Sequence, residues 1–377
     1  MHILIVNSEY PPIGGGASNA SAHIARNLVQ LGQRVTVLTA AYQSQPRDEE
    51  VDGLRVIRVL ALRKKLDRST TSEQVSFMLS ASLLGLGHIN RLRPDVALAF
   101  FGAPSGVAAW FWSFFFKLPY IVSLRGGDVP GFRPYDFARQ HRLLGPLLRQ
   151  VWRRAGAVVA NSEGLRQLGQ VFDPRVPLRV IPNGVDLDKF KTDVREWEPA
   201  RLLFVGRVVY QKGLDLLLNA LSELRELKWK LAIIGDGPRV EHLRKQANQL
   251  QISERVDFPG WQSRQMLPNT YQQANLFVYP SRHEGMPNAV LEAMASGLPV
   301  LASRIAGNED LVTKETGMLV PAEDTGALKS ALAELIPNTT ARERMGVAAR
   351  QRVEAQYSWR VVAQAYLDLM TTIVESR

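Results

Sequence analysis

Short apolar runs alternate with longer stretches of helical periodicity along the first half of the chain. Residues 2–7 read as a buried strand, and three glycines separate them from a helical pattern over residues 17–31. Gly32 is expected to end that helix. Further strands are predicted at residues 34–39, 56–59, 95–100, 120–123 and 157–160. Strands that alternate with helices predict a parallel sheet with helices on both faces.

The same alternation restarts near residue 200. Strands are predicted at residues 201–205, 230–234, 256–258, 276–279 and 299–302, with helices at 214–224 and 359–373. The stretch 182–199 has few long apolar runs and reads as a connector. We therefore predict an α/β fold of two Rossmann-like, doubly wound domains that face a central cleft, because ligands of such sheets bind beyond the carboxyl ends of the strands. The predicted domains are residues 1–185 and 186–357, and helix 358–377 is expected to cross back onto the first.

Length and composition narrow the class of protein. A chain of 377 residues suits two α/β domains. There is no cysteine, which excludes disulfides, thiolate metal sites and a cysteine nucleophile. The first residues lack a basic leader, and no apolar run approaches the ~20 residues needed to span a bilayer. These features favour a cytoplasmic protein.

The positive charge is concentrated in the first half. The net charge is +10; residues 1–190 carry 23 Lys and Arg against 14 Asp and Glu, whereas residues 191–377 carry 23 against 22. A basic domain attracts anionic partners. No nucleic-acid-binding motif is present, so we expect acidic lipids or pyrophosphate carriers rather than nucleic acid. Segments 63–68 and 139–154 are the candidate membrane-facing regions, whereas the aromatic run 110–116 is expected to lie mainly in the core.

The most informative segment follows the predicted strand 276–279. Glu284 is a candidate catalytic residue, and the candidate donor-binding residues are Gly285, Met286, Pro287, Asn288, Ala289 and Glu292. Glycine and proline shape a tight loop, and the amides at the start of the following helix suit an anion such as a diphosphate. Glu292 lies one turn into the helix, where it can accept hydrogen bonds from ribose, and Glu284 can reach the sugar. The alternative is a solvated glutamate pair around an ordinary turn.

Two cations follow the first strand of the second domain. Gly206 ends that strand, and Arg207 and Lys212 come directly after it. A departing nucleoside diphosphate gains negative charge, which fixed cations stabilise. Both side chains could instead be ordinary surface cations. Gly235, after the next strand, would let the backbone approach the same ligand.

The glycines Gly14, Gly15 and Gly16 follow the first strand of the chain. They do not match the dinucleotide-binding fingerprint, and the second strand ends in Thr39 rather than an acidic residue. Three glycines still permit a close backbone approach to phosphate or sugar. A flexible turn is the alternative.

Taken together, these motifs resemble glycosyltransferase family 4, whose members are retaining enzymes of the GT-B fold. The resemblance rests on Gly14–Gly16, the run 181–186 (Ile-Pro-Asn-Gly-Val-Asp), Gly206-Arg207 with Lys212-Gly213, residues 234–238 and the segment 284–292. It implies a nucleotide-sugar donor on the second domain and an acceptor on the first. It also implies Arg207 and Lys212 on the diphosphate, Glu292 on ribose, Glu284 on the donor sugar, and neither a cofactor nor a catalytic metal.

One position departs from the family pattern. Many relatives carry a histidine after the strand that corresponds to residues 120–123, and Arg125 stands there in this chain. Arginine cannot act as a base at neutral pH, but it can hold a sugar hydroxyl or a phosphate. Asp128 is the nearest carboxylate and a candidate for binding the acceptor hydroxyl; the alternative is an aspartate that caps a turn.

The resemblance implies transfer of a sugar to a saccharide or polyprenyl-diphosphate-linked acceptor in polysaccharide, lipopolysaccharide or glycolipid synthesis. The basic first domain suggests peripheral attachment to the inner face of a membrane. A nucleotide-sugar epimerase of the same fold and a non-catalytic nucleotide-sugar-binding scaffold are the alternatives. Asp186 and Asp188 form a D-x-D pattern, which we interpret as turn and helix-start chemistry rather than a metal site.

Overall fold

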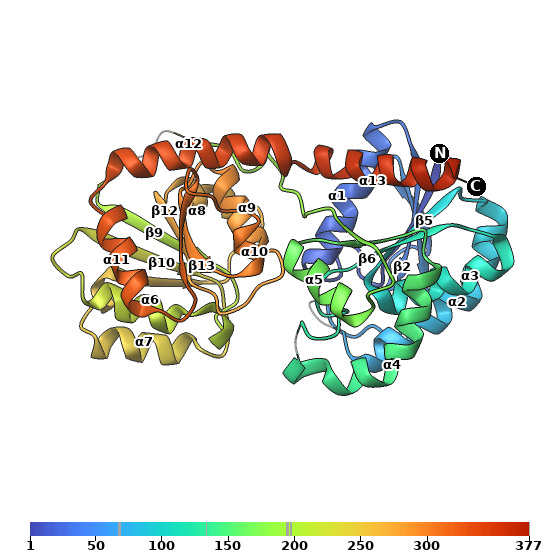
Figure 1. Ribbon diagram of the computed structural model, residues 1–377, viewed down its shortest axis with the longest axis horizontal. Coiled ribbons are helices and arrows are strands. Elements are labelled where there is room, and N and C mark those ends of the chain that lie inside the picture. Colours follow the sequence, from blue (N-terminus) through green and yellow to red (C-terminus); the bar gives the residue numbers. More distant parts are fainter. Residues whose placement is uncertain (67–68, 133, 194–195, 197, 377) are drawn as a thin grey trace. The chain divides into compact units, whose positions relative to one another are not determined.

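The computed structural model describes residues 1–66, 69–132, 134–193, 196 and 198–376 (Figure 1). The chain divides into two compact units. Unit 1 comprises Met1–Asn183 and Trp359–Arg377, and unit 2 comprises Gly184–Ser358. Each unit is described by itself below.

Unit 1 is built on an eight-stranded sheet in the order β3-β4-β2-β1-β5-β6-β7-β8. The strands are β1 (His2–Val6), β2 (Arg34–Ala40), β3 (Asp48–Val51), β4 (Leu54–Val59), β5 (Val96–Phe100), β6 (Tyr120–Ser123), β7 (Ala157–Ala160) and β8 (Leu178–Val180). All neighbours are parallel except β3 and β4. The chain order reverses direction between β1 and β5, which makes their carboxyl ends the switch point of this sheet.

Helices cover both faces of this sheet, as parallel strands require. They are α1 (Gly16–Gln30), α2 (Thr71–Leu92), α3 (Gly106–Phe116), α4 (Pro134–Arg154), α5 (Glu163–Phe172) and α13 (Trp359–Glu375). The core on one face joins alternate strand residues to α1 and α13. The core on the other face joins the remaining strand residues to α2, α3, α4 and α5. The final helix, α13, therefore belongs to unit 1, although unit 2 separates it in sequence from the rest of that unit.

Unit 2 has a six-stranded, fully parallel sheet in the order β11-β10-β9-β12-β13-β14. Its strands are β9 (Ala200–Val205), β10 (Trp229–Ile234), β11 (Val256–Gly260), β12 (Leu276–Tyr279), β13 (Val300–Arg304) and β14 (Gly317–Pro321). The helices are α6 (Leu214–Ser222), α7 (Val240–Gln249), α8 (Leu267–Gln272), α9 (Asn288–Ala295), α10 (Ala306–Glu309), α11 (Thr325–Leu335) and α12 (Thr339–Gln356). The switch point of this sheet lies between β9 and β12.

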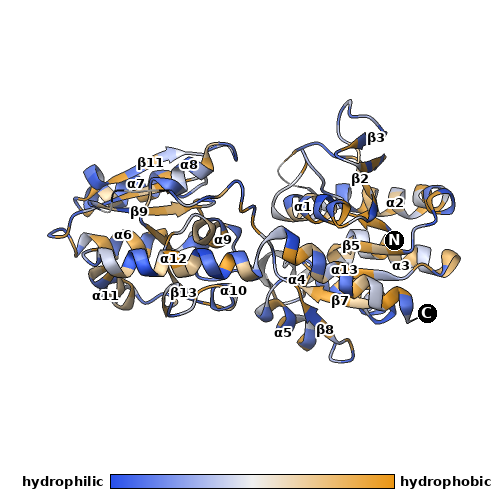
Figure 2. Ribbon diagram, turned by 90° about the horizontal axis from the view of Figure 1, so that it is seen from above, coloured by the Kyte–Doolittle hydropathy of each residue, from blue (hydrophilic) through white to orange (hydrophobic). Residues whose placement is uncertain are grey.

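Most of the strands in both units are strongly hydrophobic, as Figure 2 shows for β5, β7 and β9. Residues 3–6 of β1 and most of β9 are almost completely buried. This burial is the main source of stability for each unit. No helix in the described ranges is long and apolar enough to cross a membrane.

Candidate functional site

Lys212 lies at the switch point of unit 2, in the short turn η2 (Tyr210–Lys212) that follows β9. Gly213 directly after it has φ +65°, and a Cβ there would come within 2.0 Å of the Pro280 carbonyl oxygen. Only glycine fits this close approach. The turn is therefore held against the end of β12, and the Lys212 side chain is buried.

The Lys212 ammonium makes two short contacts. Its Nζ donates to the Tyr279 hydroxyl at 2.5 Å and to Glu284 Oε1 at 2.5 Å. The side chains of Lys212 and Glu284 are only 9% and 10% exposed, so the ion pair is largely desolvated. Removing one partner of such a pair leaves an uncompensated buried charge. Burial raises the pKa of Tyr279 well above its usual value, and the neighbouring Glu284 carboxylate adds to the increase.

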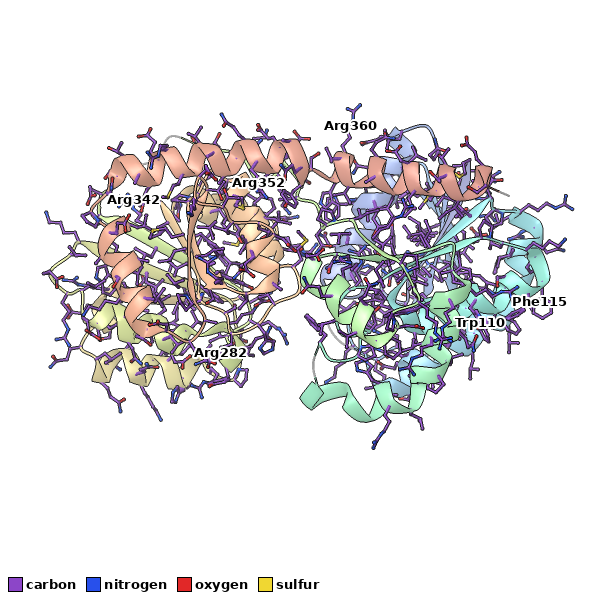
Figure 3. The ribbon with its side chains drawn as sticks, in the orientation of Figure 1. Trp110, Phe115, Arg282, Arg342, Arg352 and Arg360 are labelled. Atoms are coloured by element: carbon purple, nitrogen blue, oxygen red, sulfur yellow. The ribbon has the colours of Figure 1, made fainter. Side chains whose placement is uncertain are left out.

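Arg282 holds the turn that carries Lys212 (Figure 3). It donates to both carboxylate oxygens of Asp215 at 3.0 and 2.8 Å, and to the Tyr210 carbonyl at 2.6 Å. Its guanidinium also lies 3.8 Å from the centre of the Tyr210 ring. Burial alone would raise the pKa of Asp215, but Arg282 brings it below its ordinary value. Arg282 is therefore a positioning residue for Lys212.

Arg207 differs from Lys212 because its side chain is exposed. Among the residues that the structure describes, no ion pair or hydrogen bond of its guanidinium is found. It follows Gly206, whose carbonyl oxygen would lie 1.9 Å from a Cβ at Gly235. Gly235 has φ +136° and accommodates this contact because it lacks a side chain. The loops after β9 and β10 are thus packed closely together beside Arg207.

The segment 284–292 connects the end of β12 to α9. The helix begins at Asn288 after Pro287, and none of the described side chains caps its start. The first turn of a helix presents backbone N–H groups and a partial positive charge, which suit an anion. Gly285 is packed against α10: a Cβ at Gly307 would lie 2.1 Å from the Gly285 oxygen. The loop therefore has little room to move away from the strand edge.

Glu292 lies one turn into α9 and accepts a hydrogen bond of 2.9 Å from the Tyr271 hydroxyl, on α8. Burial raises the pKa of Glu292 to about 7, although Tyr271, Arg264 and Lys189 act in the opposite direction. Its carboxyl is therefore poised between the two protonation states near neutral pH.

In unit 1 the three glycines lie at the end of β1, between Glu9 and the start of α1. Gly14 has φ +94°, and its N–H donates to the Leu66 carbonyl at 2.7 Å. Gly15 precedes the helix and has open space where a Cβ would be, and Gly16 is the first helical residue. Burial raises the pKa of Glu9, although Arg63 and the Gly15 amide act in the opposite direction.

Arg125 lies after β6 and is half-buried. Its guanidinium donates to Asn183 Oδ1 at 2.7 Å and to the Tyr366 hydroxyl at 3.5 Å, and it stacks 4.4 Å from the centre of the Phe100 ring. Its Nε is buried with no hydrogen-bond partner in the described part of the chain. Burial lowers the pKa of Arg125. Within the described residues the guanidinium donates its hydrogen bonds to neutral groups, so it can bind an anionic or hydroxyl-bearing ligand.

Asp128 is occupied by backbone amides. Its Oδ1 accepts from the N–H groups of Arg125 and Gly126 at 2.9 and 3.0 Å, and its Oδ2 accepts from Gly102 at 2.9 Å. Burial raises its pKa, although these amides act in the opposite direction. The geometry favours the turn-capping alternative for Asp128, which joins the loops after β5 and β6. Asp186 behaves in the same way, because its Oδ1 accepts from the backbone N–H groups of Asp188 and Lys189, each at 3.1 Å.

Comparison with known proteins identifies the family. Residues 15–184 match the glycosyl transferase 4-like domain, and residues 187–352 match the glycosyl transferases group 1. A GDP-mannose-dependent alpha-(1-6)-phosphatidylinositol monomannoside mannosyltransferase of Mycobacterium tuberculosis is 30% identical, over 98% of this chain and 97% of the relative. The protein is a group 1 glycosyltransferase. A glycogen synthase of M. tuberculosis is 28% identical to this glycosyltransferase, over 97% and 93% of the two chains.

Solved structures give the group 1 glycosyltransferase the GT-B fold. Sucrose-phosphate synthase from Thermosynechococcus elongatus superposes with a TM-score of 0.84 at 21% identity, over the whole of both chains. HepE from Anabaena, solved with UDP and glucose, superposes with a TM-score of 0.76 at 18% identity, over 99% of this chain and all of that one.

Sequence reasoning missed three residues of the candidate site in unit 2, which are Tyr271, Tyr279 and Arg282. In unit 1 it missed Glu9, which lies beside the glycine loop. Tyr279 is the last residue of β12 and Glu9 follows β1, so their places at strand ends were a usable signal. Tyr271 and Arg282 act through Glu292 and Asp215, and only the folded chain brings these pairs together.

Proposed function

We propose that this glycosyltransferase moves a sugar from a nucleoside diphosphate sugar to a saccharide or lipid-linked acceptor, with retention of configuration. The observation that carries the proposal is the buried Lys212–Glu284 pair at the switch point of unit 2, between an exposed arginine and an uncapped helix start. At one edge of the sheet, this arrangement supplies positive charge that can bind a diphosphate. It also supplies a carboxylate that can accept hydrogen bonds from sugar hydroxyls. The UDP and UDP-glucose complexes of HepE are consistent with it.

In the proposed reaction, the bond between the anomeric carbon and the diphosphate oxygen breaks as the acceptor oxygen bonds to the same face. The acceptor hydroxyl passes its proton to an oxygen of the leaving phosphate. Arg207, Lys212 and the first amides of α9 stabilise the negative charge that develops on the diphosphate. Glu284 accepts hydrogen bonds from the donor sugar, and Glu292 accepts them from ribose. The proposed reaction uses no metal and no cofactor.

Unit 2, with the backbone of Gly206, Gly235 and segment 285–289, is proposed to bind the donor. Unit 1 is proposed to bind the acceptor, with the Gly14–Gly16 loop contributing backbone contacts. Arg125 would hold a phosphate or hydroxyl group of a substrate. Asp128 would act by positioning the loop that carries Arg125, since its own oxygens accept backbone N–H groups.

The setting that we propose is polysaccharide, lipopolysaccharide or glycolipid synthesis at the cytoplasmic face of a membrane. A mannosyltransferase that acts on a phosphatidylinositol monomannoside is among the relatives, as is a lipopolysaccharide core glycosyltransferase of Rhizobium meliloti. The basic excess of residues 1–190 fits an acceptor anchored in an anionic surface.

A donor panel tests the proposed function directly. The purified chain is incubated with UDP-, GDP- and ADP-sugars, with and without a membrane extract, and release of nucleoside diphosphate is measured. We expect release from one donor to rise when the extract is present and to be unaffected by EDTA, with the sugar linked in its original anomeric configuration. Conversion of the donor without any acceptor would instead indicate an epimerase, and binding without release would indicate a scaffold.

The raised pKa of Glu292 predicts opposite effects of pH on donor binding and on stability. The ionised carboxylate is the better acceptor for ribose hydroxyls, so donor affinity should rise as the pH passes through about 7. The free energy of unfolding should instead fall as the pH rises. The reason is that the folded chain holds a proton on Glu292 that the unfolded chain releases near the usual, lower pKa of a glutamate. The stabilising contribution is complete at low pH and is lost as the pH rises through about 7. Between about pH 5.5 and about pH 8.5, titration calorimetry measures the donor affinity and thermal unfolding measures the stability.

Glu292→Gln is the matched variant, because it keeps the shape and removes the ionisation. We expect weaker donor binding above pH 7, a flatter pH dependence of donor affinity, and unfolding at a higher temperature than the parent at pH 8. An unchanged pH dependence of binding in this variant would contradict the role of Glu292.

A further inference from the structure

Helices α2 and α3 of unit 1 carry a large exposed apolar surface that the proposed chemistry does not use. Along α2, Val75, Leu79 and Leu83 recur one turn apart and are 43%, 55% and 62% exposed. On α3, Phe114 and Phe115 are 52% and 61% exposed. We call these five residues the α2–α3 face. Isolated exposed hydrophobic residues are ordinary, but a contiguous group of this kind marks an interaction surface.

The two helices that carry the face pack directly against each other. Trp112 of α3 is buried against Gly85 of α2, where an added Cβ would come within 2.4 Å of the indole ring. The Trp112 indole N–H also donates to the Ser82 carbonyl at 3.0 Å. The expected burial of segment 110–116 is therefore correct for Trp112 and wrong for Phe114 and Phe115. The reason is that one side of α3 packs on the sheet while the other faces solvent (Figures 2 and 3).

The face itself carries no charge, and two cations lie at the carboxyl end of α3. Residues 74–87 of α2 and all of α3 contain no Asp, Glu, Lys or Arg. At the end of α3, Arg154 stacks 4.1 Å from the centre of the Phe114 ring and donates to the Ser113 hydroxyl at 2.8 Å. Lys117 caps the carboxyl end of the helix. An apolar surface bordered by cations is complementary to a bilayer that contains acidic lipids.

A groove of about 770 Å³ begins at this border. Its charged lining within the described residues is Lys117, Arg154 and Arg179, and Ser113, Thr372 and Ser376 add hydroxyl groups. Among the described residues that line it, none carries a carboxylate. The groove therefore offers cationic and hydroxyl donors beside Phe114, which suits the phosphate of a lipid headgroup whose acyl chains lie against the apolar face.

Apart from Arg154 at the end of α4, the segments that the sequence suggested for membrane contact fit less well. The Arg63 side chain is only 3% exposed and turns inward to Glu9 and the carbonyls of Lys65 and Leu66. Lys64 and Lys65 are exposed, and Asp67 and Arg68 lie outside the described residues. On α4, Arg149 and Arg153 bind Phe172 and Asp173, so they hold α5 rather than form a free basic surface.

We propose that the α2–α3 face is the surface by which this glycosyltransferase docks on an anionic lipid bilayer, with Lys117, Arg154 and Arg179 on the lipid phosphates. This inference rests on the proposed function, in which the acceptor lies in a membrane. It identifies the part of the chain that contacts that membrane. The proposed docking on the bilayer uses residues of unit 1 alone.

The absence of cysteine makes the proposal directly measurable. Single variants Phe115→Cys and Leu83→Cys each carry one thiol for a polarity-sensitive fluorophore, and Trp261→Cys, at a 73% exposed aromatic position of unit 2, is the matched control. With vesicles of phosphatidylglycerol and phosphatidylcholine at low salt, we expect a blue shift at positions 115 and 83 and none at 261. The shift should weaken in high salt.

Vesicle co-sedimentation of unlabelled variants gives the magnitudes. We expect Phe114→Ser/Phe115→Ser to lower the partition coefficient by about tenfold, and each of Lys117→Gln and Arg179→Gln to lower it by about fivefold. Trp261→Ser should bind like the parent. Vesicle binding without a fluorescence response at positions 83 and 115, or a response without vesicles that grows with protein concentration, would overturn the proposal; the latter would identify a second copy as the occupant.

The donor assay separates this proposal from the proposed function. Normal release of nucleoside diphosphate with a soluble acceptor, together with no vesicle binding, would refute the membrane surface alone. Vesicle binding through this face with no sugar transfer from any donor would refute the proposed function alone.

Discussion

Lys212→Met is expected to lower turnover by ~10²–10³-fold, as the loss of one fixed donor to a developing negative charge does in other enzymes. Lys212 is the buried cation of the unit 2 switch point, and its ammonium lies 2.5 Å from both Tyr279 and Glu284. The effect should fall mainly on kcat, because the charge on the diphosphate is greatest as the bond breaks. Steady-state release of nucleoside diphosphate measures it.

The same substitution has a structural cost that must be separated from catalysis. Without Lys212, Glu284 becomes a buried charge without its cation, which destabilises by about 3–5 kcal/mol. The double variant Lys212→Met/Glu284→Gln removes both charges, so its unfolding temperature should recover while turnover stays low. Lys329→Met is the control: its pair with Glu223 is exposed, and its loss should change neither quantity. Recovery of turnover in the double variant would refute a catalytic role for Lys212.

Arg207→Ala is expected to lower turnover by a similar ~10²–10³-fold, but with no loss of stability. Arg207 is exposed, and the described residues show no ion pair for it, so truncation leaves no unpaired partner. This one substitution should therefore lower turnover while leaving the free energy of unfolding unchanged. Release of nucleoside diphosphate and thermal unfolding, measured on the same preparation, check both halves of the prediction.

Arg225→Ala provides the comparison for Arg207. Arg225 is also on unit 2, but it precedes β10 and therefore lies toward the amino edge of the sheet. Its removal should leave turnover unchanged. Near-normal turnover in Arg207→Ala, or an equal loss in Arg225→Ala, would remove Arg207 from the proposed chemistry.

The alternation of apolar runs predicted most of the fold because buried parallel strands are nearly continuous hydrophobic segments. The strands β6, β7 and β12 begin and end where the sequence placed them, and most others differ by one or two residues. Three strands were missed. β3 is an acidic, exposed edge strand whose pairing with β4 uses an ion pair between Asp48 and Arg55. β8 has only three residues, two of them exposed, and β14 begins with glycine and ends with proline. None of the three has the composition of a buried strand.

The candidate site was predicted less completely than the fold. Arg207, Lys212 and segment 284–292 were predicted because they follow strands and lie near glycines. The carboxyl ends of parallel strands meet at one edge of a sheet, which brings the residues after them together. The pairing of Lys212 with Glu284 joins positions 72 residues apart and depends on how close η2 lies to the end of β12. The hydrogen bonds of Asp128 could not be predicted from the sequence for the same reason, because its three backbone donors come from two different loops.

The position of the bound donor diphosphate decides whether Lys212, Arg207 and the start of α9 carry the proposed chemistry. A crystal structure of the chain with an unhydrolysable analogue of the donor that the panel identifies would locate it. We expect its phosphates to lie within hydrogen-bonding distance of Lys212, Arg207 and the first amides of α9, with ribose at Glu292. Phosphates bound elsewhere, with none of these groups in contact with them, would contradict the proposed donor site.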